Sequence, residues 1–271
     1  CDPATTVEFC CATESGKLAV VVGAAIGGAE SGLLWPIVTA TVFATWFGAE
    51  TVLGISATFV KEGLSGVVAD PVGASMCLII AGLFFAPLLY RMHLLTIGDY
   101  YRARYSREVE LIMTICIMIS YLGWVSAQVT ALGLVFNMIS GGAIEQSTGM
   151  YIGTAIVLSY TMLGGMWSVA LLDFVQMTVI MAGMLLIAVL VSGDVGGVGN
   201  VVNHAQAAGK LQFLPQGGYE VWVPFIGAGI TMMLGSIPQQ DVFQRMTSAK
   251  DEKTAVRGSV AGGVLYFAFA F

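Results

Sequence analysis

Long uncharged stretches separated by short polar ones run along most of the chain, which is the pattern of membrane-spanning helices. The stretches that predict helices are 31–49 continuing past Glu50 to 60, 71–90, 111–140, 150–192, 221–240 and 258–271. As a single helix, 150–192 would measure about 64 Å, twice the thickness of the hydrocarbon layer. We therefore predict two helices there, broken at the "LGG" of 163–165. The last stretch is too short to cross a bilayer and the chain begins without Met, so we expect part of a longer protein.

The composition supports a multi-pass membrane protein. Hydrophobic residues make up 57% of the chain and charged residues only 10%, whereas a soluble domain carries about 25% charge. A net charge of −6 gives no indication of nucleic-acid binding. The distant His93 and His204 do not suggest a metal site, and the cysteines do not suggest a disulfide framework: Cys1, Cys10 and Cys11 lie in a polar stretch, Cys77 and Cys116 in apolar runs.

The basic residues predict the orientation of the helices. They gather in two loops, one with Arg91, Arg102, Arg104 and Arg107, the other with Arg245, Lys250, Lys253 and Arg257. The positive-inside rule places both loops in the cytoplasm, which requires an even number of crossings between them. The division above supplies four: 111–138, 149–163, 165–192 and 221–240. We expect 91–110 to be an amphipathic connector and 194–219 an external loop.

The stretch "ATWFGAETVLGISATF", 44–59, places Glu50 inside an apolar segment, between Gly48 and Gly54. One interpretation is a helix that ends near Gly48 and an external loop after it. The other is a single discontinuous helix over 34–60, about 40 Å long, whose unwound turn exposes carbonyl oxygens. Irregular backbone at membrane depth occurs only where it lines a cavity or is buried in protein. The length favours the discontinuous helix.

Two aspartates also interrupt apolar segments. Asp173 lies about 12 Å into its helix from the predicted break, and a carboxylate at that depth costs roughly 2.5–3.5 kcal/mol. Arg245 is a partner at a suitable depth, in a structural ion pair or on an ion pathway. Asp70, directly before Pro71, is by itself most simply an interfacial carboxylate at a helix N-terminus.

The segment "GSIPQQDVFQR", 235–245, ends an apolar helix with Pro238, Gln239 and Gln240. A proline within a span frees backbone groups for other partners, although the two amides fit an interfacial position equally well. Trp46 and Trp124 lie in the middle of predicted spans, where packing is the usual role.

Together these features predict a helical membrane protein with acidic, partly unwound interior positions, suited to moving a cation or a cation-coupled solute. A channel is less natural because no pore-loop or ring motif occurs. An enzyme would need a nucleophile–base or metal constellation, and none is recognisable, so we expect no enzymatic activity.

Three motifs resemble the sodium:solute symporter family. "GGMWSVALLDFVQ" is similar to the family signature Gly-Gly-x-x-x-Val-x-x-Thr-Asp-x-x-Gln, "PQQDVFQRMTSAKDEKTAVRG" to its Gln-x-x-x-Gln-Arg segment, and "ATWFGAETVLG" to its first core helix. The matches run in order over about 35–271. "ATW", "GLFFAPL", "LGW" and "MLGSIPQQDVFQR" are most similar to the choline-transporter-like branch.

The resemblance implies an all-α fold of five plus five helices in inverted repeat, here truncated after about seven core helices. The first repeat would cover about 34–193 and the second would begin at about 220–271, while 1–33 fit no helix of the family. It also implies sodium-coupled symport of a small organic solute by alternating access, in the cell inner (plasma) membrane, with no cofactor other than sodium as the coupling ion.

The resemblance further implies roles for single residues. The backbone carbonyls of Ala44 and Phe47 would bind sodium, together with a later helix that the chain lacks. The substrate would contact Trp46, Glu50, Thr51, Asp70, Trp124, Gln239 and Gln240. Asp173 would meet sodium on its cytoplasmic exit route, paired with Arg245 between passages.

Two departures from the family pattern bear on these roles. Leu172 replaces the usual Thr beside Asp173, which argues against a second sodium site there. Gln239 stands where choline-type members place a Trp, which argues for a more polar solute as much as for choline. A solute-sensing domain of a histidine kinase is the alternative function, and a passive channel, indifferent to sodium, is a third.

Overall fold

The computed structural model describes residues 32–92, 94 and 96–270, without the side chains of 163–167. The long secondary-structure elements of the described residues are helices, as predicted. The chain forms two compact units: the larger comprises Leu34–Leu95 and Asp173–Phe271, and the smaller contains Thr96–Leu172. Cys1, Cys10, Cys11 and His93 lie outside the described residues, and so do the expectations for them.

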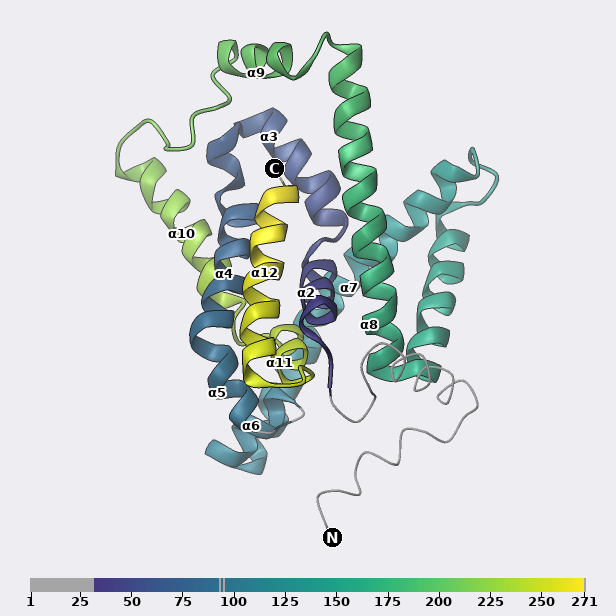
Figure 1. Ribbon diagram of the computed structural model, residues 1–271, viewed down its shortest axis with the longest axis vertical. Helices are drawn as coiled ribbons and strands as arrows, with labels where there is room; N and C mark the ends of the chain where they lie inside the picture. The colour runs from purple at the N-terminus through teal and green to yellow at the C-terminus, as the bar shows by residue number, and fades with distance from the viewer. Residues whose placement is uncertain (1–31, 93, 95, 271) are drawn as a thin grey trace. The chain divides into compact units, whose positions relative to one another are not determined.

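The larger unit begins with a helix in two pieces, α2 (Trp35–Trp46) followed by the π-helical turn η3 (Glu50–Ile55) and α3 (Ser56–Glu62) (Figure 1). A long second helix follows, divided into η4 (Leu64–Val68), η5 (Ala69–Gly73), α4 (Ala74–Ile80), η6 (Ala81–Phe85) and α5 (Ala86–Arg91). The unit then takes in the later part of α8 (Gln146–Asp194), α9 (Val198–Ala207), α10 (Tyr219–Gly235), α11 (Gln240–Thr247) and α12 (Glu252–Ala270).

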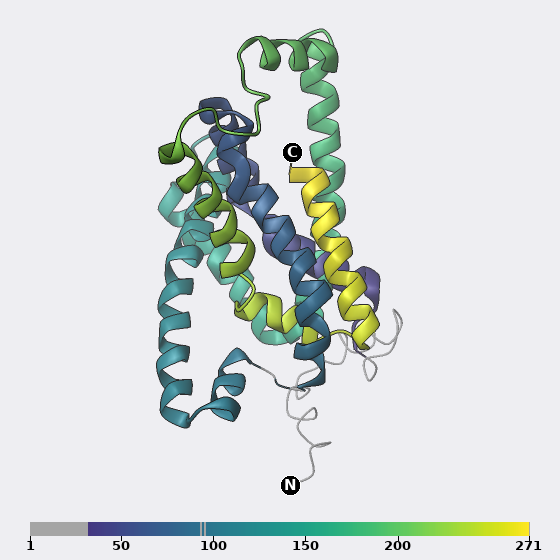
Figure 2. The same cartoon turned by 90° about the vertical axis from the view of Figure 1, so that its left-hand side faces the viewer.

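Helix α12 packs against α2 and α4, and Figure 2 shows it, in yellow, beside the blue second helix. Gly258 and Gly262, one turn apart, form its contact with α2. A Cβ atom on Gly258 would lie 2.5 Å from Val38 Cγ1, and one on Gly262 would lie 2.7 Å from Val42 Cγ1. Small residues at this spacing let two helices approach closely, which is the usual basis of helix association within a membrane.

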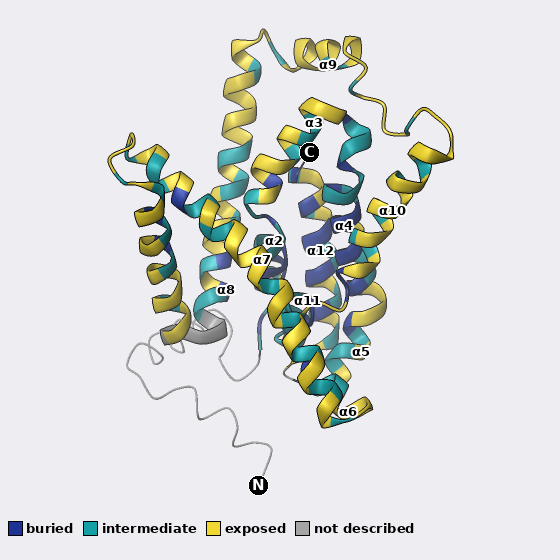
Figure 3. Ribbon diagram, turned by 180° about the vertical axis from the view of Figure 1, so that it is seen from behind, coloured by how far each residue is buried: buried dark blue, intermediate teal, exposed yellow. Residues whose placement is uncertain are grey.

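Burial follows the same arrangement. The buried side chains gather on α2, α4, α11 and α12, drawn dark blue in Figure 3. Large apolar side chains of α7 and of the later part of α8 are exposed instead. Exposed apolar helices are what a lipid environment requires, since lipid chains are as apolar as the side chains themselves.

Three described helices are long and apolar enough to cross a membrane: Leu64–Arg91, Arg107–Ile139 and Ser168–Asp194. Two bent pairs raise the number to five if each is one span. The first, Trp35–Trp46 with Glu50–Glu62, bends by 56°, and the second, Tyr219–Gly235 with Gln240–Thr247, by 41°. The predicted interruption within 34–60 is therefore confirmed, and Pro238 lies in the second break.

Two contacts in the larger unit bring the predicted cytoplasmic loops together. The guanidinium of Arg91 donates from Nε and Nη2 to the carboxylate of Glu252, at 2.9 and 3.0 Å. The hydroxyl of Tyr90 donates to the carbonyl of Lys250 at 2.8 Å. The end of α5 and the start of α12 therefore lie at the same end of the unit, as the distribution of basic residues predicted.

In this loop, the side chain of Asp251 binds a backbone N–H in the first turn of α12. Its carboxylate accepts a hydrogen bond from the Thr254 N–H at 2.8 Å. This bond is the largest cause that lowers the pKa of Asp251, since it favours the charged form. A carboxylate that accepts from the first turn also satisfies a helix N–H that has no partner within the helix.

The smaller unit contains α6 (Ile97–Arg104), α7 (Arg107–Ile139) and the first part of α8. Thr96 and Asp99 form a reciprocal capping box at the start of α6, so the predicted connector 91–110 contains a short helix. Helices α7 and α8 approach closely at Gly133, where a Cβ atom would lie 2.4 Å from Met150 Cγ and 2.6 Å from the Gln146 carbonyl oxygen.

The observed bounds of α8, of the loop 194–219 and of the second helix bear on the predicted ones. Helix α8 is assigned without interruption from Gln146 to Asp194; the break predicted at 163–165 falls among residues whose side chains are not described, and it stays a prediction. The part of α8 that qualifies as a span begins at Ser168. The predicted external loop 194–219 contains the helix α9, and the second helix begins at Leu64 rather than Pro71.

The glycine contact predicts a packing defect in Gly258→Ala. The added methyl group would overlap Val38, and overpacking of this kind typically costs about 1–3 kcal/mol. Gly227→Ala on α10 is the control, because nothing lies within 4 Å of the added Cβ atom. We expect a lower thermal unfolding temperature in detergent for Gly258→Ala alone. Equal temperatures for the two variants would contradict the close approach.

Candidate functional site

The interruption of the first helix has a defined geometry. Helix α2 ends at Trp46, and Phe47 follows with φ −85° and ψ 74°, the conformation of an inverse γ-turn. The N–H of Gly48 therefore donates to the Trp46 carbonyl at 3.1 Å. In a continuous helix it would donate to the carbonyl of Ala44, four residues back. The break thus takes away the usual helical donor of the Ala44 carbonyl.

Three aromatic rings hold this break in place. Phe43 stacks on Phe47 with ring centroids 4.9 Å apart. Tyr266 of α12 packs its edge against both rings, at 6.4 and 5.8 Å. Phe43 and Tyr266 are fully buried and Phe47 is 4% exposed. The turn is therefore fixed by packing on α12 as well as by its own backbone bonds.

A polar network adjoins the aromatic cluster and joins four elements, α2, η3, η5 and α12. The Tyr266 hydroxyl lies 2.8 Å from Thr51 Oγ1, on η3, and donates to Asp70 Oδ1, on η5, at 2.6 Å. Thr51 Oγ1 also lies 3.1 Å from the Trp46 carbonyl, to which it donates. Asp70 is therefore not a purely interfacial carboxylate, the simplest interpretation of its sequence position, because it contacts the buried Tyr266.

The backbone at Asp70 is locally extended. Its φ of −134° and ψ of 121° interrupt the second helix within η5. Helix α10 packs against this segment: a Cβ atom on Gly73 would lie 3.0 Å from Met232 Cβ and 3.1 Å from the Gly229 carbonyl oxygen. Glu50, at the start of η3 and exposed, acts electrostatically on both Asp70 and Tyr266.

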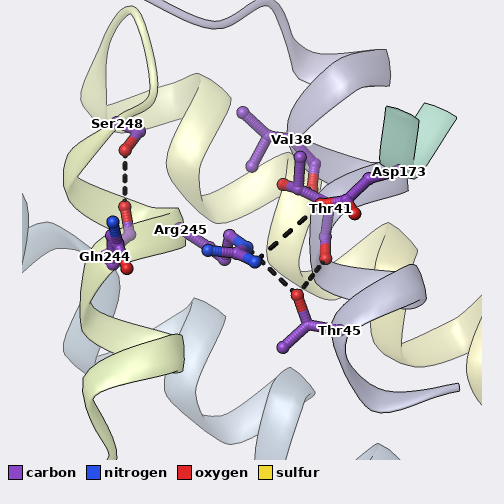
Figure 4. A network of polar contacts seen from close by, with 7 residues as sticks. All are labelled: Val38, Thr41, Thr45, Asp173, Gln244, Arg245 and Ser248. Carbon is purple, nitrogen blue, oxygen red and sulfur yellow. Dashed lines mark hydrogen bonds and ion pairs between the residues drawn. The ribbon is translucent and has the colours of Figure 1, made fainter. Parts of the chain in front are cut away.

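Asp173 and Arg245 meet beside α2 (Figure 4). Arg245 Nη2 lies 3.8 Å from Asp173 Oδ2, and both side chains are nearly buried, at 13% and 12% exposure. This distance suits an ion pair but is too long for a hydrogen bond, and Oδ2 has no hydrogen-bond partner among the described residues. Arg245 Nε instead donates to Thr45 Oγ1 at 3.0 Å.

The Thr45 hydroxyl continues this contact into α2. It donates to the Thr41 carbonyl at 2.6 Å, and the Thr41 hydroxyl donates to the Val38 carbonyl at 3.0 Å. Arg245 belongs to α11, so it lies on the second piece of a broken helix rather than beyond the end of a continuous one. The two broken helices are thus joined by an arginine–threonine bond one residue from Ala44.

The remaining predicted site residues are only partly brought together. Gln239 caps the start of α11 with extended backbone and is exposed, and Gln240 is half-buried. Trp46 is half-buried at the end of α2. Trp124 is an exposed residue of α7, which belongs to the smaller unit, and it packs its ring edge against Tyr121.

Sequence reasoning missed Tyr266 and Thr45. Tyr266 is the one tyrosine of an otherwise apolar and glycine-rich terminal run, "GGVLYFAFAF", and a buried tyrosine hydroxyl needs a partner. That requirement was the available signal. Thr45 gave none, because a threonine within a helix usually bonds to the preceding turn.

A sodium ion can be held by oxygen atoms alone, including backbone carbonyls at an unwound helix. Transition metals prefer nitrogen and sulfur ligands as well. Within the part of the chain that the structure describes, no three His, Cys, Asp or Glu side chains are grouped for a metal ion. The carbonyl end of α2 suits a hard cation, since it also carries the negative end of the helix dipole.

Comparison with known proteins shows which family the chain belongs to. The sequence model of the sodium:solute symporter family matches residues 26–270. The high-affinity choline transporter 1 of Caenorhabditis elegans is 28% identical over 88% of this chain and 40% of its own length. Its human counterpart is 29% identical over 83% of this chain and 38% of its own length. Sodium-coupled monocarboxylate transporter 2 of Bos taurus is 26% identical over 80% of this chain and 36% of its own.

A solved structure shares the fold. The substrate-bound, outward-open state of a Na⁺-coupled sialic acid symporter superposes with a TM-score of 0.73, at 17% identity, over 94% of this chain and 56% of that one. The chain spans less than half the length of these curated relatives. The two choline transporters among these relatives support the resemblance to the choline-transporter-like branch. This multi-pass membrane chain belongs to the sodium:solute symporter family, a family of transporters rather than enzymes.

Proposed function

We propose that the chain forms part of a sodium-coupled symporter for a small organic solute, working by alternating access in the plasma (inner) membrane. The observation that carries this proposal is the break at Phe47. There the Gly48 N–H turns to the Trp46 carbonyl and leaves the Ala44 carbonyl without its helical donor. Freed carbonyls at a half-helix C-terminus are the usual ligands of a coupling sodium ion in transporters of this architecture.

In this proposal, the carbonyl oxygens of Ala44 and Phe47 hold sodium. The solute lies beside the break, against Trp46, Glu50, Thr51, Asp70, Gln239 and Gln240, while the expected contact with Trp124 of the smaller unit stays a prediction. Two carboxylates in this set, Glu50 and Asp70, favour a cationic or zwitterionic solute over a monocarboxylate anion, because like charges repel. The amide of Gln239 favours a solute that also forms hydrogen bonds.

Asp173 and Arg245 form the cytoplasmic part of the ion pathway in this proposal. A buried carboxylate oxygen without a hydrogen bond retains its capacity to bind a cation. The 3.8 Å gap to Arg245 keeps the charge balanced without closing a strong bond. A sodium ion that leaves the break can therefore replace Arg245 at Asp173 for the time of its passage.

Uptake by the complete transporter in proteoliposomes tests the proposal. A panel of radiolabelled choline, a monocarboxylate and sialic acid should be compared under an inward sodium gradient and an equal potassium gradient. We expect accumulation of a cationic or zwitterionic solute with sodium only. Equal uptake with both ions would indicate a passive channel, and binding without accumulation would indicate a sensor.

Asp173→Asn should slow sodium-driven uptake by roughly tenfold, equivalent to about 1.4 kcal/mol. The change removes the carboxylate charge but keeps its size. The double variant Asp173→Asn/Arg245→Gln separates transport from structure, because it leaves no unpaired buried charge. Asp173→Asn alone leaves the Arg245 charge buried without its partner, which should lower expression and thermal stability. We expect the double variant to regain expression and thermal stability but not the uptake rate. Wild-type uptake kinetics in either variant would reject the role in the pathway.

Glu50→Ala should abolish binding of the transported solute, measured as equilibrium binding of the labelled compound found in the uptake panel. The carboxylate lies at the start of η3, directly after the break. Glu62→Ala, an exposed carboxylate at the end of α3, is the matched control and should bind as the wild type does. Unchanged affinity in Glu50→Ala would remove this residue from the site.

A further inference from the structure

The network around Tyr266 contains more oxygen contacts than hydrogens to fill them. Three contacts join four groups: the Trp46 carbonyl with Thr51 at 3.1 Å, Thr51 with Tyr266 at 2.8 Å, and Tyr266 with Asp70 at 2.6 Å. A carbonyl and an ionised carboxylate supply no hydrogen, and each hydroxyl supplies one. With Asp70 ionised, two hydrogens therefore serve three contacts.

In the ionised state the hydroxyls must turn toward Asp70. Tyr266 donates to the carboxylate, because a charged acceptor makes the strongest bond. Thr51 has one hydrogen for two acceptors, Tyr266 at 2.8 Å and the Trp46 carbonyl at 3.1 Å. The shorter contact takes it in this state, so Thr51 gives up its bond to the Trp46 carbonyl. Tyr266 is fully buried and Thr51 is 4% exposed, so both hydroxyls are shielded from bulk water.

One added proton fills the whole network. A protonated Asp70 donates to Tyr266, Tyr266 donates to Thr51, and Thr51 donates to the Trp46 carbonyl. All three contacts become hydrogen bonds, and every hydroxyl in the row reverses its direction. The protonation state of Asp70 thereby decides whether the Trp46 carbonyl, one residue before the turn at Phe47, receives a hydrogen bond from Thr51.

This reversal changes what the break presents to a cation. With Asp70 ionised, the Thr51 oxygen faces the break with its lone pairs; with Asp70 protonated, the Thr51 hydrogen points there. A positive ion at the carbonyls of Ala44 and Phe47 favours the first arrangement, because lone pairs attract it and a hydroxyl hydrogen repels it. Proton and cation therefore favour opposite states of one network.

We propose that Asp70 is a proton-binding site whose state is relayed through Tyr266 and Thr51 to the break, so that proton and sodium binding oppose each other. The proposal rests on the proposed function for its sodium site. Glu50 on η3 is the other carboxylate that acts on Asp70. Of the packed elements, α4 carries Cys77, and α10 carries ionisable groups only in its first turn, at Tyr219 and Glu220.

Infrared difference spectroscopy of the complete transporter tests the proton site without any transport. A pH titration should show a protonated-carboxyl C=O band that is missing in Asp70→Asn. Sodium chloride, compared with potassium chloride at equal ionic strength, should shift the appearance of this band to lower pH. An unchanged band in Asp70→Asn would overturn the assignment.

Sodium binding tests the relay, with Trp46 fluorescence or calorimetry as the readout. Below the pH at which Asp70 takes up its proton, the half-saturating sodium concentration should rise by up to about tenfold for each unit by which the pH is lowered. This is the limit for one proton competing with one ion. Thr51→Val cuts the relay and should reduce this rise to less than about twofold. Thr39→Val on α2 is the control, because its hydroxyl donates only within the helix, to the Trp35 carbonyl.

The outcomes separate this proposal from the proposed function. A sodium response whose pH dependence is the same in Thr51→Val and Thr39→Val overturns the relay and leaves the symporter proposal standing. No sodium response at any pH overturns both. Tyr266→Phe gives a second measurement of the relay, and it should lose the pH dependence while it keeps the ring packing on Phe47.

Discussion

A helix can be interrupted inside a membrane only where its released backbone groups meet protein, water or an ion, and this constraint governs the first helix of the chain. The turn at Phe47 is supported on two sides. Tyr266 holds it through ring packing and through Thr51, while Arg245 reaches Thr45 from a second broken helix. The break is thus a built feature of the larger unit, and the carboxylates of Asp70 and Asp173 are positioned by the same side chains that hold it.

Close helix packing makes these contacts possible. The glycine face of α12 brings its backbone against α2, and Tyr266 lies one turn beyond Gly262 on the same helix. A larger residue at either glycine would move the tyrosine away from the break. The structural core and the polar network are therefore one arrangement, in which a change of packing on α12 is also a change at the candidate site.

Much of this was predictable from residue types and lengths. Glu50 within an apolar segment predicted the interrupted helix, and the basic loops predicted that Arg91 and the segment before α12 share one end. Depth alone indicated Arg245 as the partner of Asp173. The link from Asp70 to Tyr266 was not predictable, because it joins residues 196 positions apart and depends on how closely α12 approaches. The π-helical turns and α9 were also missed, since exposed or irregular short helices lack a strong periodic pattern.

A cation site at the break of 44–51 should be visible in a structure of the complete transporter determined in sodium. We expect an ion coordinated by the carbonyl oxygens of Ala44 and Phe47, absent when potassium replaces sodium. A continuous helix through this segment, with the Gly48 N–H bonded to the Ala44 carbonyl and no ion beside it, would rule out the cation site.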